Sequence, residues 1–306
     1  MPIVNGMNSD YVDYFPLDDY VDRIILLPYV LEHLEETNHS FKDYIKKIVS
    51  YSEEYAIDYW IYLLYEELKF NQKIENIDFS KINLIDDEVF FTTLTISNKR
   101  IHELHNFATT GQYEPIFEYR KGEVDVSRKN EMGEKEIFWR GANAEDIEQF
   151  MNDFIKIYKR NDISLIMSNP FLKSSLIHLL FLRIHPYSDG NGRTARLLHN
   201  SKFTEGINKI YGTRLKLSPL NLSESILVNK LSYTNAIDNI YFDLEHDTNE
   251  AINKWFNVML NMADEQIFSS TLKLENIDPS LLKALQENND MNITQTPERM
   301  RIKKFK

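Results

Sequence analysis

The sequence predicts a mainly α-helical fold, a helical bundle with one small β-hairpin. Along most of the chain apolar residues recur at three- and four-residue steps, as on the buried face of an amphipathic helix. Residues 113–141 differ, because short extended runs flank a polar tip that contains Gly133, a pattern typical of a β-hairpin. No stretch rich in Pro, Gly and Ser divides the chain, so we expect one main helical body with an N-terminal helical extension.

The N-terminal extension is predicted to cover residues 1–93. Residues 1–20 look irregular and acidic, and helical periodicity begins near Val21. Three helical stretches follow, over 24–36, 40–55 and 57–74, and residues 77–93 are loop-like.

The main body is predicted to cover residues 94–265. The stretch 171–184 is apolar on nearly all sides and therefore belongs in the centre of the core. Further helices are expected at 94–108, 143–158, 194–211, 224–243 and 248–265, and the hairpin joins runs within 115–126 and 136–139. Residues 266–306 form a C-terminal part, with a helix at 279–287 and a basic tail.

Composition and charge argue against several classes of protein. The chain has no cysteine, so neither a disulfide framework nor a Cys-based metal site or nucleophile is possible. A net charge of −12 argues against a nucleic-acid binder, which normally presents a basic face. The longest apolar stretches, roughly ten residues, are too short to cross a bilayer. No basic region followed by an apolar run opens the chain, so we expect a cytoplasmic protein, or one exported by a route that leaves no such signal. We expect neither nucleic-acid nor membrane partners.

One short segment joins two predicted helices and carries most of the polar chemistry: His185-Pro-Tyr-Ser-Asp-Gly-Asn-Gly-Arg-Thr-Ala-Arg196, here called the motif loop. Pro186 stops the buried helix, and the Gly-Asn-Gly turn at 190–192 leads into the next one. Such a turn leaves backbone N–H groups without helical partners, where the helix dipole adds positive potential. The loop therefore predicts a phosphate site.

The side chains of the motif loop suit a polyphosphate and a proton transfer. Arg193 and Arg196 lie three residues apart on one side of the first helical turn, and two guanidinium groups suit a multiply charged anion. Asp189 is a hard carboxylate of the kind that binds Mg²⁺ bridging phosphate oxygens. The imidazole of His185 makes it the candidate general base, because histidine ordinarily titrates near neutrality.

Taken alone, each feature has an ordinary structural explanation, such as a turn, a core histidine or a solvated helix face. Together they match H-P-[FY]-x-[DE]-G-N-G-R-x-x-R, which is expected by chance on the order of 10⁻⁹ times per chain of this length. The loop resembles the signature of the Fic family of AMP-transferases, with Tyr187 where the family usually has Phe. The similarity covers about residues 60–265. It includes the preceding helix at 177–185, the hairpin, which resembles the Fic flap, and residues 229–233.

This resemblance implies a Fic-type helical bundle with a β-hairpin flap, and a protein adenylyltransferase activity. AMP would pass from ATP to a Ser, Thr or Tyr hydroxyl of a target protein, including this chain itself. His185 would deprotonate that hydroxyl, and Asn191 and Arg193 would complete the catalytic set. Asp189 would hold Mg²⁺. The residues implied to bind ATP are Asp189, Gly190, Asn191, Gly192, Arg193, Arg196 and Tyr233.

The family also implies which phosphate each group meets. The N–H groups near residues 190–192, with the Asn191 side chain, would hold the α- and β-phosphates, Arg193 would stabilise the leaving pyrophosphate, and Arg196 would bind the γ-phosphate. Doc-like kinases of the same superfamily carry Lys at the place of Gly192, so glycine favours AMP transfer over phosphorylation. Transfer of UMP or phosphocholine stays open.

Many Fic proteins carry an inhibitory helix, [ST]-x-x-x-E-[GN], whose Glu pairs with the second Arg of the loop. The segments 71–76, 201–206 and 271–276 compete for this role. The first has Asn71 in place of Ser or Thr, but it keeps an Ile-Glu-Asn core and lies 110 residues before His185, as in N-terminally regulated members. We predict Glu75 as the inhibitory residue, with Glu275 as the alternative. Glu205 lies on the helix that leaves the loop, and we do not expect this helix to fold back onto the loop. The absence of any inhibition also stays open.

The expected partners are ATP and a target protein, which the hairpin would clamp by main-chain pairing. A homodimer remains open. Two rival functions are the removal of AMP, with Glu75 orienting water, and an inactive nucleotide-binding or interaction module. The intact His185, Asp189 and Arg196 argue against the second rival. His102 and His105 lack a visible third ligand, so we interpret them as part of a helix face rather than as a metal site.

Overall fold

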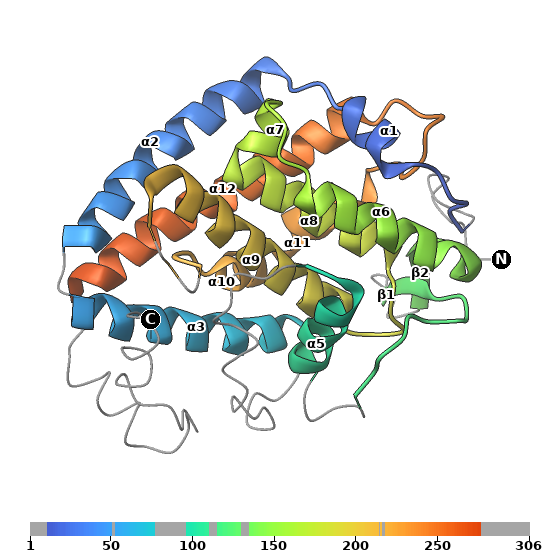
Figure 1. The fold of residues 1–306 in the computed structure, drawn as a ribbon, viewed down its shortest axis with the longest axis horizontal. Coiled ribbons are helices and arrows are strands. Elements are labelled where there is room, and N and C mark those ends of the chain that lie inside the picture. The colour runs from blue at the N-terminus through green and yellow to red at the C-terminus, as the bar shows by residue number, and fades with distance from the viewer. Residues whose placement is uncertain are drawn as a thin grey trace.

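The computed structural model describes residues 11–50, 53–76, 96–109, 115–129, 135–213, 215 and 218–276. Within these ranges the chain is mostly helical, with one two-stranded antiparallel sheet (Figure 1). The predicted fold class, mainly α with a small hairpin, is confirmed. No helix in these ranges has both the length and the apolar character needed to cross a membrane.

Three helices form the N-terminal part: α1 (Leu17–Asp22), α2 (Pro28–Ser50) and α3 (Glu53–Ile74). The prediction of separate helices at 24–36 and 40–55 is wrong, because α2 runs through both. The residues between the two predicted segments, 37–39, are helical and continue α2 without a break. Pro28 occupies the first position of α2, where a missing N–H costs nothing, so the helix starts there rather than at residue 24.

The helix α8 (Pro170–Ile184) forms the centre of the core, and all of its residues are buried. Its sequence dictates this place, since apolar side chains occupy nearly every face. The side chain of Asn169 caps its start by accepting from the N–H groups of Phe171 and Leu172, at 2.9 and 3.2 Å. Three helices pack around α8: α6 (Ile147–Lys159), α9 (Asn191–Tyr211) and α12 (Asn249–Asn276). The predicted central helix is thus confirmed, and its C-terminal end fixes the start of the motif loop.

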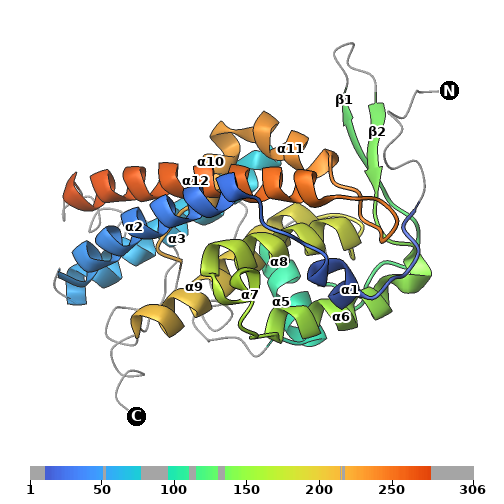
Figure 2. The same cartoon turned by 90° about the horizontal axis from the view of Figure 1, so that it is seen from above.

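The C-terminal helices differ in two respects from the predictions. The predicted helix 224–243 is wrong, since it is broken into α10 (Leu222–Val228) and α11 (Lys230–Asp238). At the break, the Asn229 side chain donates to Ser225 O (3.1 Å) and to Glu265 Oε2 (2.7 Å), so it competes with the helical hydrogen bonds. The helix α12 lies alongside α2 (Figures 1 and 2) and passes through the predicted domain boundary at 265/266. The predicted helix 279–287 lies outside the described residues.

The hairpin consists of β1 (Asp125–Lys129) and β2 (Lys135–Arg140), and its register shifts between Val126 and Ser127. It projects from one end of the helical body (Figure 2). The predicted extended run at residues 115–119 is not part of the sheet, and β1 begins later than expected. Val12 pairs with the chain just after β2, in a parallel bridge to Ala142. The remaining described elements are α5 (Asn98–Ala108), the short α7 (Leu165–Ser168) and a 3-10 turn at Ala144–Asp146.

Candidate active site

His185 ends α8 in a left-handed conformation, with φ 55° and ψ 58°. This conformation costs a non-glycine residue roughly 1–2 kcal/mol, so the surroundings must hold it in place. Its backbone N–H donates to Phe181 O at 3.1 Å, and its Nδ1 lies 3.2 Å from Leu182 O. Because a carbonyl oxygen only accepts, Nδ1 carries the proton and Nε2 has the free lone pair. Burial lowers the pKa of His185 to about 4, so the ring is neutral at pH 7, as a general base requires.

Asn191 closes the motif loop on itself. Its side-chain oxygen accepts from the Tyr187 N–H at 3.0 Å, and its side-chain nitrogen donates to Tyr187 O at 2.7 Å. The residue is buried. Both polar atoms of this side chain are thus bonded to the backbone of Tyr187, and its expected contact with phosphate stays a prediction. In this arrangement Asn191 holds the turn in shape and contributes its backbone N–H to the start of α9.

Gly190 is required at the turn before α9. Its φ of 79° is left-handed, and a Cβ there would lie 2.5 Å from Thr109 Cγ2 and 2.8 Å from His105 Cε1. The helix begins directly afterwards, at Asn191, three residues earlier than predicted, and its first turn closes when Thr194 N donates to Gly190 O at 3.0 Å. The backbone amides of Asn191 and Gly192 thus belong to a first turn, where a helix offers no acceptor. This local geometry fits the predicted phosphate site.

Asp189 lies at the outer edge of the loop, with its side chain 58% exposed. One carboxylate oxygen accepts from Gly190 N at 2.6 Å and the other from Arg193 Nη2 at 3.2 Å. Among the described residues no three His, Cys, Asp or Glu side chains cluster around a possible metal. A single accessible carboxylate beside the predicted phosphate site suits Mg²⁺, which takes few protein ligands when it also binds substrate phosphates.

The two arginines of the loop point to different partners. Both are buried, and Arg193 pairs with Asp189. Arg196 contacts α3 instead: its Nε donates to Asn71 Oδ1 at 2.5 Å, and its Nη2 lies 2.8 Å from Glu75 Oε1 and 3.3 Å from Asn71 O. The guanidinium predicted to bind the γ-phosphate is therefore held by the N-terminal part of the chain.

Glu75 directly follows the last residue of α3, and its side chain is 38% exposed. A Cβ at Gly192 would lie 3.1 Å from Glu75 Oε1, which shows how closely the carboxylate lies over the first turn of α9. Lys230 Nζ donates to Ile74 O at 2.7 Å and so holds the end of α3 from α11. The carboxylate thus occupies space next to the predicted phosphate site.

Asn71 stands where the inhibitory pattern has Ser or Thr, and the structure shows what it does there. Besides its contacts with Arg196, its side-chain nitrogen lies 3.3 Å from Arg193 O. The residue is fully buried. An amide carries both a donor and an acceptor, so Asn71 connects to the backbone and to the guanidinium of α9 at once. Asn71 departs from the Ser or Thr of the inhibitory pattern, but its contacts still allow α3 to pack closely against α9.

The other two candidate inhibitory residues have partners elsewhere. Glu275, at the end of α12, pairs with Lys47 of α2. Glu205 pairs with Lys202 on its own helix, at 2.8 Å. Of the three predicted glutamates, the structure brings Glu75 to Arg196.

Tyr233 lies in a buried polar cluster behind Arg196. Its hydroxyl is 2.8 Å from Nε2 of His178, on the central helix. Burial raises the pKa of Tyr233, while the nearby positive charge of Arg196 opposes this rise. Tyr233 therefore touches the arginine side of the site and does not lie at an exposed face. His178 is a core histidine, as predicted.

His102 and His105 of α5 support the motif loop from behind. The ring of His105 stacks on that of Tyr187, with centroids 3.7 Å apart, and its Nδ1 lies 3.2 Å from Thr194 Oγ1. Nδ1 of His102 lies 2.8 Å from the Tyr187 hydroxyl. The hydroxyl that distinguishes Tyr187 from phenylalanine thus has a partner, and neither histidine belongs to a metal cluster of the described residues.

Two residues near His185 have no sequence pattern that predicts them. Arg120 is buried, and its guanidinium donates to the carbonyls of His185 (2.8 Å), Gly122 (2.7 Å) and Ala142 (2.5 Å). The ring of Trp139, on β2, lies edge-on to the imidazole of His185, with centroids 5.1 Å apart. Both contacts join residues far apart in the chain, so only the folded structure shows that they lie around the candidate base.

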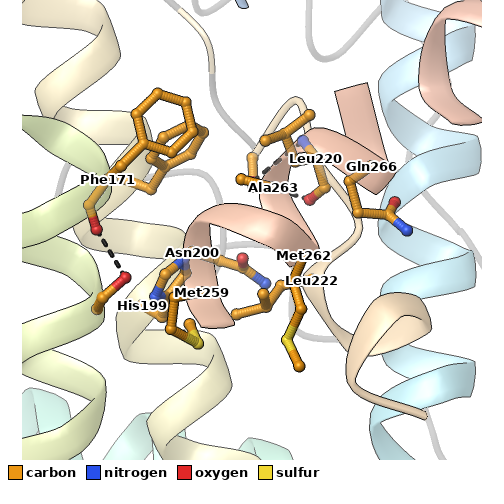
Figure 3. A pocket seen from close by; sticks show the side chains of 12 residues that line it. Phe171, His199, Asn200, Leu220, Leu222, Met259, Met262, Ala263 and Gln266 are labelled. Atoms are coloured by element: carbon orange, nitrogen blue, oxygen red, sulfur yellow. Dashed lines mark hydrogen bonds between the residues drawn. The ribbon is translucent and has the colours of Figure 1, made fainter. Parts of the chain in front are cut away.

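Two hollows in the described part of the molecule lie away from the motif loop. One, of about 20 Å³, is enclosed by α8, α9 and α12, with polar edges from His199, Asn200 and Gln266 (Figure 3). It has room for about one water molecule and not for a nucleotide. The other, of about 500 Å³, lies between the end of α1 and residues 243–249, and its acidic lining is unfavourable for a polyphosphate. The motif loop therefore remains the candidate site, with the Glu75 side chain over it.

Comparisons with known proteins agree with this fold and loop. A sequence profile described as the Fic/DOC family matches residues 95–201. A Fic family protein from Desulfovibrio desulfuricans G20 shares the fold, with a TM-score of 0.59 and 14% identity over 87% of this chain and 79% of that one.

Two other solved structures align with lower scores. A Fic domain containing signaling protein from Bacteroides thetaiotaomicron VPI-5482 has a TM-score of 0.44 and 17% identity, over 86% of this chain and 96% of that one. Fic-1 from C. elegans has a TM-score of 0.49 and 16% identity, over 85% and 74%. No protein with a curated description matches the sequence. Residues 95–201, which include the complete motif loop, thus match the Fic/DOC family, and the fold of the chain resembles that of a solved Fic family protein.

Proposed function

We propose that this chain is a protein adenylyltransferase that moves AMP from ATP onto a Ser, Thr or Tyr hydroxyl of a target protein, and that Glu75 inhibits it. The observation that carries the proposal is the arrangement of the motif loop. A neutral His185 with a free Nε2 is followed, six residues later, by the first turn of a helix whose amides suit a phosphate. The match of residues 95–201 to the Fic/DOC family supports transfer of a phosphate-containing group to a protein.

In the proposed reaction, His185 Nε2 removes the proton from the target hydroxyl as its oxygen attacks the α-phosphorus of ATP. A new oxygen–phosphorus bond forms, and the bond to pyrophosphate breaks. The backbone amides of Asn191 and Gly192 stabilise the phosphate oxygens, and Arg193 stabilises charge on the leaving pyrophosphate. Asp189 is the residue that would hold Mg²⁺, which supplies further charge neutralisation when bound.

The nucleotide chemistry is proposed from Gly192. A Cβ at this position would lie 3.3 Å from Arg196 Nη1 as well as close to Glu75, so a larger residue would fill the space beside the arginine. Glycine leaves that space for the phosphates of ATP, in keeping with AMP transfer rather than the phosphorylation expected when Lys stands here.

The proposed inhibition follows from the contacts of Arg196. One guanidinium group cannot serve the carboxylate of Glu75 and the γ-phosphate of ATP in the same geometry. The negative charge of Glu75 is also unfavourable next to a polyphosphate. ATP would therefore bind productively only after Glu75 moves away from Arg196.

The decisive experiment compares ATP labelled at the α-phosphate with ATP labelled at the γ-phosphate, using wild type, Glu75→Gly and Glu75→Gly with His185→Ala. We expect the α-label alone to appear on protein, more strongly with Glu75→Gly, and to disappear with His185→Ala. Transfer of the γ-label would indicate a kinase, and transfer that survives His185→Ala would reject this mechanism. ATP binding without transfer in both His185-containing proteins would indicate an inactive binding module.

The reverse reaction, removal of AMP, is a second candidate. It is favoured by the partly exposed Glu75 carboxylate over the loop, since a carboxylate there could orient a water molecule. An AMP-modified protein incubated with wild type and with Glu75→Gly distinguishes the two. Release of AMP by wild type that is lost with Glu75→Gly would support the reverse reaction.

A further inference from the structure

Arg183 is a buried charge whose place in the core is not explained by hydrogen bonding. It lies in the last turn of α8, two residues before His185, and its relative exposure is 0%. Among the described residues, none of its three side-chain nitrogens has a hydrogen-bond partner. A buried charge without hydrogen bonds disfavours folding, whereas an apolar side chain of similar size would not. Its presence therefore calls for a role other than stability.

The surroundings of Arg183 are aromatic. Its guanidinium carbon lies 4.7 Å from the ring centroid of Trp139 and 6.0 Å from that of Phe242, both within the range of cation–π attraction. Burial lowers the pKa of Arg183 to about 10, with opposing contributions from Tyr20, Asp238 and Asp243, so the group stays charged at pH 7. A permanent cation thus lies against the face of the Trp139 ring.

Trp139 connects this cation to the candidate base. Its ring is perpendicular to the His185 imidazole, at an interplanar angle of 84°. On the imidazole itself, the described hydrogen bond is that from Nδ1 to Leu182 O. One hydrogen bond leaves a ring free to tilt, so the edge-on tryptophan supplies a second constraint. Trp139 also belongs to β2, so the same contact connects the base to the hairpin.

We propose that Arg183 is a positioning residue for His185: it holds Trp139 by a cation–π contact, and Trp139 in turn holds the imidazole with Nε2 directed at the acceptor hydroxyl. This inference rests on the proposed function, because it assigns His185 the role of base. The charged groups that act on His185 are Arg183 from α8, Arg120 from the segment before the hairpin, and Asp189 from the motif loop. Arg183 and Arg120 disfavour the protonated ring, and Asp189 favours it.

The test uses the Glu75→Gly protein as the parent and compares Arg183→Met, Arg183→Lys and Trp139→Phe. We expect Arg183→Met to lower kcat about tenfold to a hundredfold, because small misplacements of a catalytic group have effects of this size, while KM for ATP changes less than about twofold. Arg183→Lys keeps the cation and should recover part of the loss. Trp139→Phe keeps an aromatic ring, so its kcat should lie between those of the parent and Arg183→Met.

A matched control is Lys202→Met. Lys202 is another buried cation over an aromatic ring, 4.5 Å from Tyr158, and it also interacts with Glu205 and Lys173. Its removal should leave kcat unchanged. A second readout, which needs no activity, is an NMR titration of the His185 ring. Arg183→Met removes the charge and should move the titration of His185 to higher pH. Arg183→Lys keeps the charge and should leave the titration of His185 unchanged.

The proposal is overturned if Arg183→Met folds with the parent's near-UV spectrum and keeps the parent's kcat and His185 titration. If Arg183→Met does not fold, Arg183→Lys and Trp139→Phe decide, and parental kcat in both rejects the proposal. Glu75→Gly with His185→Ala separates the two levels. Transfer that survives it rejects the proposed function, whereas its loss together with a normal Arg183→Met rejects only the role of Arg183.

Discussion

Arg196 Nη2 lies 2.8 Å from Glu75 Oε1, and the two residues are 121 positions apart in the chain. The arginine is buried and the glutamate is partly exposed, so the pair lies at the boundary between core and solvent. Asn71 holds the same guanidinium from the other side. This contact places the end of α3 over the motif loop.

Replacing Glu75 with Gly should raise AMP transfer at least about tenfold, because removal of a charge partner frees Arg196 for phosphate and is worth more than about 1.4 kcal/mol. Glu75 lies just beyond the end of α3, so glycine there costs little helix stability. Transfer of α-labelled ATP to the protein itself measures the effect. The matched control is Glu275→Gly, which removes a carboxylate paired with Lys47. A rise with Glu275→Gly and none with Glu75→Gly would show that inhibition comes from the C-terminal side.

Replacing Asn71 with Ala should also raise AMP transfer, although less than Glu75→Gly. The change removes the acceptor that faces Arg196 Nε and leaves a buried charged donor unpaired, at a cost of about 1.5–3 kcal/mol. The lost bond weakens the packing of α3 against α9, and it also lowers the free energy of unfolding. Asn71→Ser keeps a side-chain acceptor and should remain closer to wild type. Basal transfer and the melting temperature are measured together. A fall in stability with transfer at the wild-type level would contradict this account.

Replacing Tyr187 with Phe should lower stability by about 1–2 kcal/mol while leaving the ATP dependence of transfer unchanged. The hydroxyl is buried and bonded to His102 Nδ1, so its removal leaves a buried polar atom without that partner. Adding His102→Phe should recover part of the loss, since both partners are then apolar. Urea unfolding of the two single variants and the double variant forms a cycle. Strictly additive effects would show that the two side chains do not interact.

Stability should fall as the pH is lowered from 6.5 towards 4, because burial keeps several histidines neutral in the folded chain. The pKa values of His105 and His185 are lowered to about 4 and that of His199 to about 3, while an unfolded histidine takes up its proton near 6.5. The unfolded state therefore binds more protons in this window, and the free energy of unfolding decreases with falling pH.

His199→Gln tests this linkage. It should reduce the slope by about 1.4 kcal/mol per pH unit, the contribution of one proton. Urea unfolding at pH 7, 5.5 and 4.5 measures the slope, and His39→Gln, at an exposed position on α2, is the control. An unchanged slope for His199→Gln would mean that this ring is already protonated in the folded protein.

The sequence and the structure agree best where the determining interactions are local. The central helix 171–184 is predicted because apolar residues on every face have no other stable place than the core. The end of that helix follows from Pro186, whose backbone preference acts within one turn, whereas the next helix begins directly after Gly190, three residues earlier than predicted. The predictions are poorer for α2, which continues through the exposed His39. They are also poorer for the break between α10 and α11, where the Asn229 side chain donates to Ser225 and Glu265.

The sequence by itself determined the candidate site of this protein, because the candidate base, the predicted phosphate-binding turn, the candidate magnesium ligand and both arginines occupy twelve consecutive residues. Their spacing along one helix end is a local property and needs no knowledge of the fold. Only the tertiary structure decided which of three similar glutamates meets Arg196, that Arg120 and Trp139 contact His185, and that Arg183 lies over the Trp139 ring. Those contacts join residues far apart in the chain, and their geometry depends on how whole helices and the hairpin pack, which short sequence patterns do not record.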